Sequence, residues 1–464
     1  TGCRITSSSN WDYSKGMEQL PRLRVSPAHP NHLETEDGLF FMLGDTAWEL
    51  LHKLNEDEVS DYLDTRAEQG FNMPWIVGMP ECDSLRSPNR YGLTPLHHHD
   101  PRQPNEEYWD WVERVIQMAA ERGMYIGFLP TWADKMTAPW GDGPRIFHLD
   151  DPAPAYDFGR WVGERFAEHT NLLWVMGGDR PAAMTGLEND GLHEAARLAG
   201  FGPETDWRTL HRAMAQGVRD GAGPDILMTY HPQGGPQGSA TWLADEPWID
   251  LHAFQSGHGG GRDERIWEYI ESDLARRPLR PTFDAEPCYE DHPVRPWPTW
   301  DPRDGYFCDY DVRRTIYRSI FAGACGVVYG HHSIWHFAGD DPTGWVNHSK
   351  MTWREALVRP GARHVGMMAE WLQDLLTVGI QPAQDVFVDP QSESPGEYRV
   401  AARIGQLLLV YLPHGGAVTL RVSGDAYWFD PRTGQTMDAG VSREGETLTC
   451  IAPNSIDWVL VVES

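Results

Sequence analysis

The sequence lacks several features that would assign it to common functional classes. It contains no run of about 18 apolar residues, the length that a membrane-spanning helix requires. Its six cysteines are scattered and form no CxxC pair, which argues against a disulfide framework or a zinc knuckle. Neither GxGxxG nor GxxxxGK[ST] occurs, so no phosphate-binding glycine loop is predicted.

Positive charge is also scarce. The chain has 39 Lys and Arg against 68 Asp and Glu, a formal net charge of −29. This charge repels nucleic acid and anionic membrane surfaces, so neither is an expected partner. A hydrophobic share of 40% and a charged share of 23% are typical of a soluble globular protein. The length of 464 residues predicts two domains.

The first residues contain no intact targeting signal. The segment "TGCRITSSSNWDYSKG" (residues 1–16) has neither a basic start nor an apolar core, so it is not an intact signal peptide. It could be a remnant of processing or cloning, with Met17 as the start of a cytoplasmic enzyme, or "TGC" could end a lipoprotein signal. We favour the cytoplasmic interpretation. The sequence does not indicate the oligomeric state.

Short apolar runs alternate with helical patterns along most of the chain. Near-continuous apolar runs are typical of parallel strands that are covered on both faces. Among the helical segments, Asn55 and Glu58 predict a capping box, and Gly70 ends that helix. The apolar runs are Leu39–Trp48, Phe71–Gly78, Tyr125–Trp132, Asn171–Asp179, Asp225–Pro232, Leu251–His258, Pro281–Glu286 and Gly326–Trp335.

Eight strand–helix units predict an α/β protein with a (β/α)8 TIM barrel. A doubly wound open sheet is the alternative, but it would require the glycine-rich loop that is missing. Short strands with Gly, Pro and Asp turns then predict a C-terminal antiparallel β-sandwich. We expect an N-terminal extension (residues 1–22), a catalytic barrel (23–377) and a β-sandwich domain (378–464). Residues 23–38 should add a strand or hairpin before the barrel.

Polar and aromatic residues gather where the predicted strands end, the edge at which TIM barrels carry their active sites. Trp, His and carboxylates together suit a carbohydrate, because indoles cover the C–H face of a sugar while polar groups bond its hydroxyls. The predicted substrate-binding residues are Asp45, Trp48, Trp132, Lys135, Arg180, His231, Gln255, His258, His331, His332 and Trp335.

Two acidic residues form the candidate catalytic pair. Asp179 ends the fourth strand and Glu286 ends the seventh, on opposite sides of a barrel mouth, where two carboxyl groups can flank a glycosidic bond. We assign Asp179 as general acid/base and Glu286 as nucleophile. Asp179 could instead form an ion pair with Arg180 or cap a helix, and Glu286 competes with Asp284 and Glu290.

Strand alternation qualifies some of these assignments. Asp284 and Glu286 should share one side of their strand, with Glu286 nearer the mouth. Asp45 could cap the first helix instead of binding substrate. Because neighbours on a strand point opposite ways, only one of His331 and His332 should reach the substrate. No metal and no cofactor are predicted, and a zinc hydrolase that uses the histidines is an alternative.

Several long motifs resemble one known family. They include "FFMLGDTAWELLHKL", "YIGFLPTWADK", "WVMGGDRP", "TYHPQGG", "FQSGH" and "DAEPCYEDHP", in this order, followed by the C-terminal strands. Together they resemble the apiosidase-like glycoside hydrolases, glycoside hydrolase family 140, from about residue 23 to the end. The resemblance implies a barrel with a sandwich, an Asp and a Glu as the catalytic pair at Asp179 and Glu286, and release of apiose-linked oligosaccharides from the pectic polysaccharide rhamnogalacturonan II. Where the large clan of related barrels carries Asn-Glu, this chain has Gly178-Asp179.

The sequence therefore predicts a retaining, metal-independent glycoside hydrolase that cleaves a furanosidic, apiose-type linkage or a related linkage in plant cell-wall glycans. A β-pyranosidase is one alternative. A carbohydrate-binding or adhesion protein that kept the barrel and lost catalysis is another. The sandwich is expected to cover and stabilise the barrel rather than to bind a ligand by itself.

Overall fold

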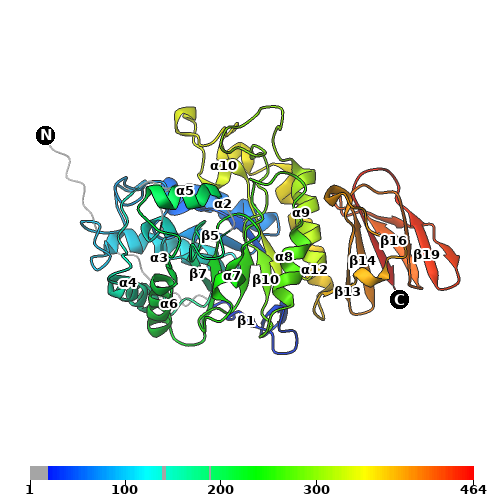
Figure 1. The fold of residues 1–464 in the computed structure, drawn as a ribbon, viewed down its shortest axis with the longest axis horizontal. Coiled ribbons are helices and arrows are strands. Elements are labelled where there is room, and N and C mark those ends of the chain that lie inside the picture. Colours follow the sequence, from blue (N-terminus) through cyan, green and yellow to red (C-terminus); the bar gives the residue numbers. More distant parts are fainter. Residues whose placement is uncertain (1–18, 138–142, 188–189, 464) are drawn as a thin grey trace.

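The protein consists of a helix-covered parallel sheet followed by antiparallel strands (Figure 1). The computed structural model describes residues 19–137, 143–187 and 190–463. The first 18 residues of the predicted N-terminal extension lie outside the described residues. The predicted fold class, a TIM-like barrel with a C-terminal β-sandwich, is confirmed.

The central sheet has eight parallel strands in the order β8-β7-β6-β5-β4-β11-β10-β9. Isolated backbone hydrogen bonds connect β8 with the segment that leads into β9. One of them, from the Asp250 N–H to Met228 O (2.9 Å), brings the two ends of the sheet together. All residues of these strands are buried, as their apolar runs predict. The strands are β4 (Met42–Thr46), β5 (Met73–Val77), β6 (Ile126–Leu129), β7 (Leu172–Gly177), β8 (Leu227–His231), β9 (His252–Phe254), β10 (Thr282–Asp284) and β11 (Gly326–Tyr329).

Alternate side chains of these strands fill the barrel interior. Trp75 is fully buried there and makes an edge contact with Phe283 (centroids 5.7 Å apart). Gly44 and Gly127 on the neighbouring strands leave room for this indole, since a Cβ atom at either position would lie within 3 Å of it. Residues of opposite parity, such as Leu43, point outward and pack against the helices.

Helices cover the outside of the barrel, where the sequence predicts them. The Asn55–Glu58 capping box is present at the start of α2, as predicted. Within the described residues, no helix combines the length and apolarity needed to cross a bilayer. The α-helices of the barrel domain are α1 (Leu50–Lys53), α2 (Glu56–Glu68), α3 (Glu106–Ala120), α4 (Ala153–Arg165), α5 (Asp190–Leu198), α6 (Arg208–Ala222), α7 (Ser239–Leu243), α8 (Ile266–Leu274), α9 (Asp309–Phe321), α10 (His332–Trp335), α11 (Trp353–Ala356) and α12 (Pro360–Leu375).

The eighth unit differs from the prediction. The sequence run suggested one strand over Gly326–Trp335, but β11 ends at Tyr329 and α10 begins at His332. The cause is a local cap: His331 Nδ1 accepts a hydrogen bond from the Ser333 N–H (3.0 Å) and thereby starts a helix.

Antiparallel strands form the remaining sheets. A small sheet of β1 (Arg24–Val25), β2 (Leu33–Thr35) and β3 (Gly38–Phe40) precedes the barrel, as predicted for residues 23–38. The sandwich pairs a six-stranded sheet in the order β12-β13-β14-β20-β16-β17 with a three-stranded sheet β15-β19-β18. Its strands are β12 (Gln381–Pro382), β13 (Val400–Ile404), β14 (Leu407–Leu412), β15 (Ala417–Leu420), β16 (Asp425–Phe429), β17 (Thr436–Asp438), β18 (Ser442–Glu444), β19 (Thr447–Ile451) and β20 (Trp458–Glu463).

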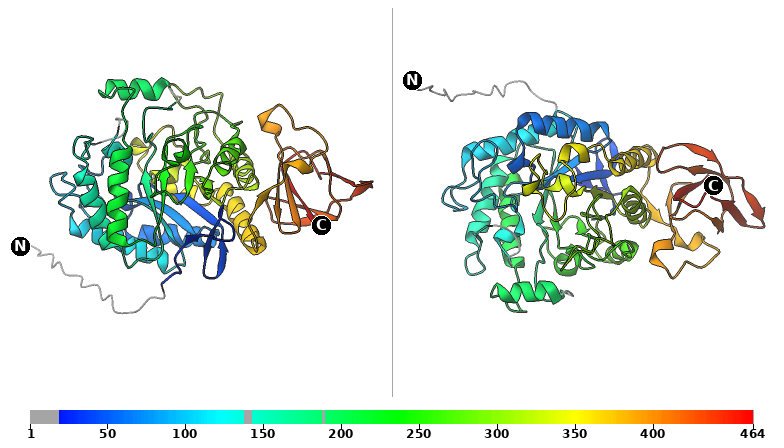
Figure 2. Two further views of the ribbon diagram at one scale, coloured as in Figure 1. Left: turned by 60° about the horizontal axis from the view of Figure 1, so that its bottom comes forward. Right: turned by 90° about the horizontal axis from the view of Figure 1, so that it is seen from above.

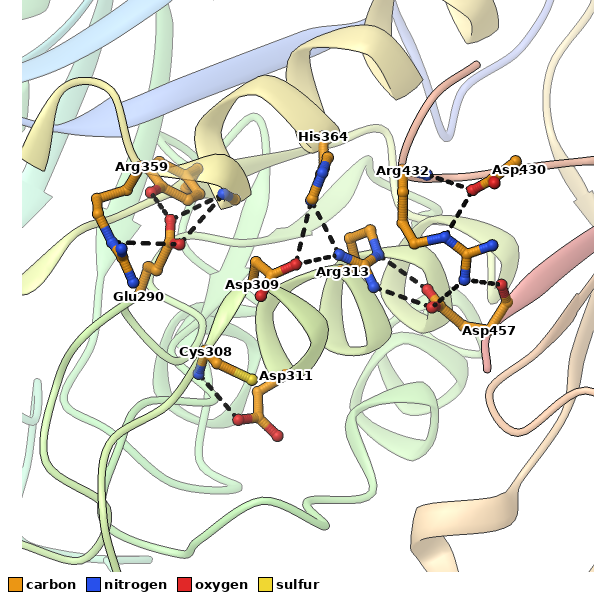
Figure 3. Close-up of polar contacts among 12 residues, drawn as sticks. Glu290, Cys308, Asp309, Asp311, Arg313, Arg359, His364, Asp430, Arg432 and Asp457 are labelled. Atoms are coloured by element: carbon orange, nitrogen blue, oxygen red, sulfur yellow. Dashed lines mark hydrogen bonds and ion pairs between the residues drawn. The ribbon is translucent and has the colours of Figure 1, made fainter. Parts of the chain in front are cut away.

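The sandwich packs beside α9 and α12 of the barrel (Figures 1 and 2). Arg313 on α9 donates two hydrogen bonds of 2.9 Å to Asp457, which precedes β20, and both side chains are buried (Figure 3). Asp457 also accepts from the Tyr411 hydroxyl and from Arg432. A buried carboxylate with several donors is stable only as long as those donors remain.

Asp457→Asn should therefore destabilise the whole protein. Loss of the anion leaves the buried Arg313 charge with Asp309 as its remaining carboxylate partner, at a cost of up to about 3–5 kcal/mol in the free energy of unfolding. Chemical denaturation followed by tryptophan fluorescence measures this cost. Glu164→Gln, which removes an exposed ion pair with Arg160 on α4, is the matched control and should leave the midpoint unchanged. Equal midpoints for both variants would contradict this role of Asp457.

Candidate active site

The turn that follows β7 presents the first candidate carboxylate. Gly177, Gly178 and Asp179 all have positive φ angles, of 86°, 123° and 47°. A Cβ atom on Gly178 would lie 2.7 Å from Cδ2 of Trp132, so only glycine allows both this backbone and the packing of the indole. The sequence "GGD" thus lets the chain turn at the end of the buried strand and directs the Asp179 side chain toward the barrel mouth.

The Asp179 carboxylate lies beside a buried arginine and is itself one-third exposed. Arg180 Nη1 lies 3.2 Å from Asp179 Oδ2, and Nη2 donates to Glu81 Oε1 (2.7 Å). Burial raises the pKa of Asp179 to about 7, and the negative charges of Glu286 and Glu81 act in the same direction, while Arg180 opposes them. Asp179 is therefore suited to carry a proton near neutral pH.

The second candidate carboxylate, Glu286, follows β10 and is held by two hydrogen bonds and a third contact at ion-pair distance. The Gln255 amide donates to Oε1 (2.9 Å), and His258 Nε2 lies 3.1 Å from the same oxygen. His231 Nε2 lies 3.3 Å from Oε2. The sequence predicted all of these residues at strand ends, and the structure brings them together around one buried carboxylate.

Both histidines point a protonated nitrogen at Glu286. His231 Nδ1 accepts the Asp179 N–H (3.2 Å), and His258 Nδ1 accepts the Tyr289 N–H (3.3 Å). A ring nitrogen that accepts a hydrogen bond carries no proton, so the proton of each ring is on Nε2. These backbone bonds thus fix each imidazole as a donor to the carboxylate.

This arrangement gives the two carboxyl groups different protonation states. Burial opposes ionisation of Glu286, but hydrogen bonds from His231 and His258 outweigh it and lower the pKa of Glu286 to about 2. The pKa of Asp179 is about 7. Near pH 6, Glu286 is an anion while Asp179 is largely protonated, which is the division that acid/base catalysis with two carboxyl groups requires.

Aromatic rings form a wall beside His231. Trp48 and Trp132 lie 5.0 Å apart between ring centroids, and each contacts the imidazole, at 5.1 and 5.6 Å. Trp48 Nε1 donates to the Tyr289 hydroxyl (2.9 Å). The two predicted tryptophans therefore lie next to the Glu286 cluster, with Tyr289 as a neighbour.

Two predicted substrate-binding residues, Asp45 and Lys135, are buried and make hydrogen bonds within the protein. Asp45 points away from the barrel interior, where its carboxylate accepts from the Tyr62 hydroxyl (2.7 Å) and Arg66 Nε (2.6 Å) of α2. It therefore neither caps α1 nor points toward the mouth, because alternation along β4 turns it outward. The fully buried Lys135 ammonium donates to Pro80 O (2.6 Å) and to Asp134 (3.0 Å).

Three further predicted residues belong to the eighth unit, where the His332 ring contacts the His292 ring (4.3 Å between centroids), which in turn stacks on His258. His331 is fully buried, with Nε2 3.1 Å from Asp291 Oδ2 and Nδ1 used in the helix cap. His332 Nε2 lies 2.8 Å from Asn347 O, and its Nδ1 accepts from Trp335 Nε1 (3.4 Å). The prediction that the two histidine side chains point to opposite sides of a strand does not apply, because neither residue lies on a strand. Among the described residues, no group of three or more His, Cys, Asp or Glu is arranged to hold a metal ion.

The acids that compete with Glu286 have structural roles. Asp284 Oδ2 accepts from the Ser256 hydroxyl (2.6 Å), and Oδ1 lies 3.2 Å from the Glu286 N–H. The two side chains contact different groups. Glu286 is not on the same strand as Asp284, because β10 ends at Asp284. Glu290 accepts from the Tyr329 hydroxyl (2.7 Å) and the Gly361 N–H at the start of α12, near Arg359 (Figure 3).

Sequence reasoning missed Glu81 and Tyr289. Glu81 lies in "MPECD", four residues after β5, and such an acid after a buried strand was a usable signal. Tyr289 lies within the motif "DAEPCYE", but nothing in the spacing shows that its backbone would bond to His258.

The comparisons with known proteins agree with this geometry. Residues 28–378 match the family model "Apiosidase-like, catalytic domain", and residues 381–463 match "Putative collagen-binding domain of a collagenase". The chain belongs to the apiosidase-like family. No match was found among the curated proteins.

Solved structures of glycoside hydrolases resemble the apiosidase-like chain over almost its entire length. One, named "Glycoside hydrolase", is 26% identical with a TM-score of 0.79, and the match covers 96% of this chain and 97% of that one. A glycoside hydrolase family 5 protein from Bacteroides vulgatus ATCC 8482 is 27% identical with a TM-score of 0.80, covering 96% and 93%. The family and these structures identify the protein as a glycoside hydrolase.

Gly178→Ala should disrupt the site. The added Cβ meets Trp132 at 2.7 Å in a backbone conformation that alanine rarely adopts, at a cost of about 1–3 kcal/mol. The displaced turn should lower kcat/KM by ~10- to 100-fold. Steady-state kinetics and thermal melts test this expectation. Gly202→Ala, where a Cβ meets nothing within 4 Å, is the control and should behave as wild type. Wild-type activity of Gly178→Ala would contradict the argument.

Glu81→Gln should lower the pKa of Asp179 from its value of about 7. Removing the negative charge of Glu81 makes the Asp179 anion less costly, and it weakens the competing ion pair of Arg180 so that Arg180 attracts Asp179 more strongly; both effects have the same sign. NMR titration of labelled aspartate carboxyl groups measures the shift. Asp284, whose pKa is raised to about 7 by its burial, is the internal control and should not move. An unchanged or higher pKa of Asp179 would contradict this electrostatic account.

Proposed function

We propose that the protein is a retaining glycoside hydrolase that cleaves a furanosidic, apiose-type linkage in plant cell-wall glycans, with Asp179 as acid/base and Glu286 as nucleophile. The observation that carries the proposal is the pair of carboxyl groups whose pKa values are driven apart, to about 7 and about 2. A single imidazole, His231, contacts both the Asp179 backbone and the Glu286 carboxylate. The apiose-type sugar rests on the description of the family model.

The first chemical step uses the protonated form of Asp179. Its carboxylic acid donates a proton to the glycosidic oxygen while a Glu286 oxygen attacks the anomeric carbon, so the C–O bond to the leaving group breaks and a glycosyl ester forms. The attacking carboxylate is already ionised, since His231, His258 and Gln255 stabilise the anion. No proton has to leave Glu286 before the reaction.

The second step returns both carboxyl groups to their starting states. Asp179, now an anion, removes a proton from water as the water oxygen attacks the anomeric carbon and the ester bond to Glu286 breaks. The sugar leaves with its original anomeric configuration. Arg180, beside Asp179, stabilises the anionic form that this step requires.

Substitution of each acid tests the assignment of roles. Glu286→Gln and Asp179→Ala should each lower kcat by about 10²–10⁴-fold or more. Only Asp179→Ala should be rescued by azide, which attacks the glycosyl ester without help from a base. Proton NMR of the first product should show retention, and wild-type activity should fall as the pH rises through about 7, where Asp179 loses its proton.

Asp273→Asn is the matched control, since the buried Asp273 accepts from the Thr282 hydroxyl (2.7 Å) at the first residue of β10, the end of the strand away from the mouth. It should keep most of the activity. Turnover by Glu286→Gln equal to wild type would refute the nucleophile, and inversion of the anomer would make Glu286 a base instead. If no furanoside, pyranoside or rhamnogalacturonan fragment is cleaved by the wild type, the chain is a binding protein on a hydrolase scaffold.

A further inference from the structure

Trp297 is exposed in a protein whose other described tryptophans are buried or only partly exposed. Its side chain is 59% exposed, and it is the single tryptophan among the exposed large hydrophobic residues of the described chain. Exposing an indole to water is unfavourable, and it is common where the ring binds a ligand. The residue lies in the loop between β10 and α9, the loop that also carries Glu286.

The base of the loop that carries Trp297 is held in place. Residues 291–307 form a narrow antiparallel loop, in which the Val294 N–H donates to Gly305 O and the Phe307 N–H donates to His292 O, both at 2.9 Å. Prolines precede and follow the tryptophan, in "RPWP", and restrict its backbone. The loop therefore presents the indole with little conformational entropy left to lose on binding.

Contacts connect this ring to the catalytic cluster. The Trp297 and His292 rings lie 5.9 Å apart between centroids, and His292 stacks on His258 at 4.0 Å with an interplanar angle of 25°. His258 in turn contacts Glu286 at 3.1 Å. The Arg295 N–H also points at His258 O (3.4 Å), so the loop and the cluster share a backbone contact. The exposed indole is thus within the length of a short oligosaccharide from Glu286.

We propose that Trp297 is the platform of an additional sugar-binding subsite, which stacks on a ring of the substrate next to the sugar that is cleaved. This inference rests on the proposed glycosidase function and adds a residue that selects oligosaccharides over small glycosides. The flat indole suits the C–H face of a sugar ring, whatever its hydroxyl pattern. His292, stacked between Trp297 and His258, positions the platform.

Assays with two substrates distinguish an effect of Trp297 on this subsite from an effect on the catalytic centre. Trp297→Ala should lower kcat/KM on an apiose-bearing pectic oligosaccharide by about tenfold, mainly through KM, because truncating a stacked tryptophan removes binding energy. The same variant should hydrolyse an aryl apioside, which cannot reach the platform, within about twofold of wild type. Trp297→Phe should recover part of the loss. Tyr91→Ala, another exposed aromatic (47%), is the matched control and should leave both substrates unaffected.

A binding measurement decides the proposal independently of turnover. In the Glu286→Gln background, calorimetric titration with the oligosaccharide should show about tenfold weaker binding when Trp297→Ala is added. Equal affinity with and without Trp297, or an equal loss of activity on both substrates, would overturn the subsite. Failure of the wild type to cleave either substrate would refute the proposed function instead, while this titration would still decide the role of Trp297. Absence of binding to either protein would refute the subsite.

Discussion

The anion at Glu286 is the constraint on which the rest of the site depends. A buried carboxylate is costly unless donors surround it, and here two imidazoles and an amide supply them. Each imidazole can donate only because its other nitrogen accepts a backbone N–H, from Asp179 in one case and Tyr289 in the other. The charge of one side chain thereby fixes the ends of β7, β8 and β9 relative to β10.

The same anion sets the chemistry of its partner. Asp179 lies partly buried near Glu286 and Glu81, so a second negative charge is unfavourable and its pKa rises. Arg180 limits this rise, because its guanidinium contacts both Asp179 and Glu81. Gly178 is explained by the left-handed backbone and by the indole of Trp132 that covers it. The pKa of Asp179 and the left-handed backbone at Gly178 are therefore two consequences of one tight turn.

The sequence predicts the fold well because its signals are local. Apolar runs, the Asn55 cap and the Gly- and Pro-rich turns locate the strands and helices without any knowledge of contacts. The cluster of His231, Gln255 and His258 could be predicted because all three follow strands that end at the same edge. Asp45 could not be excluded, since its partner Arg66 is 21 residues away on α2. Likewise His331 looked like a strand residue until its ring was seen to cap α10.

The sandwich is best understood as part of the scaffold that carries these loops. Tyr317 of α9 stacks on Tyr411 of β14 (5.0 Å between centroids), and Trp371 of α12 stacks on Phe429 of β16 (4.2 Å). The buried Arg313–Asp457 pair adds a directional ion pair between α9 of the barrel and the sandwich. Because α9 follows the loop that bears Glu286 and Trp297, and the start of α12 binds Glu290, both helices anchor segments of the catalytic face. A domain that holds α9 and α12 in place thus also restrains the loops on which the nucleophile and the exposed indole lie.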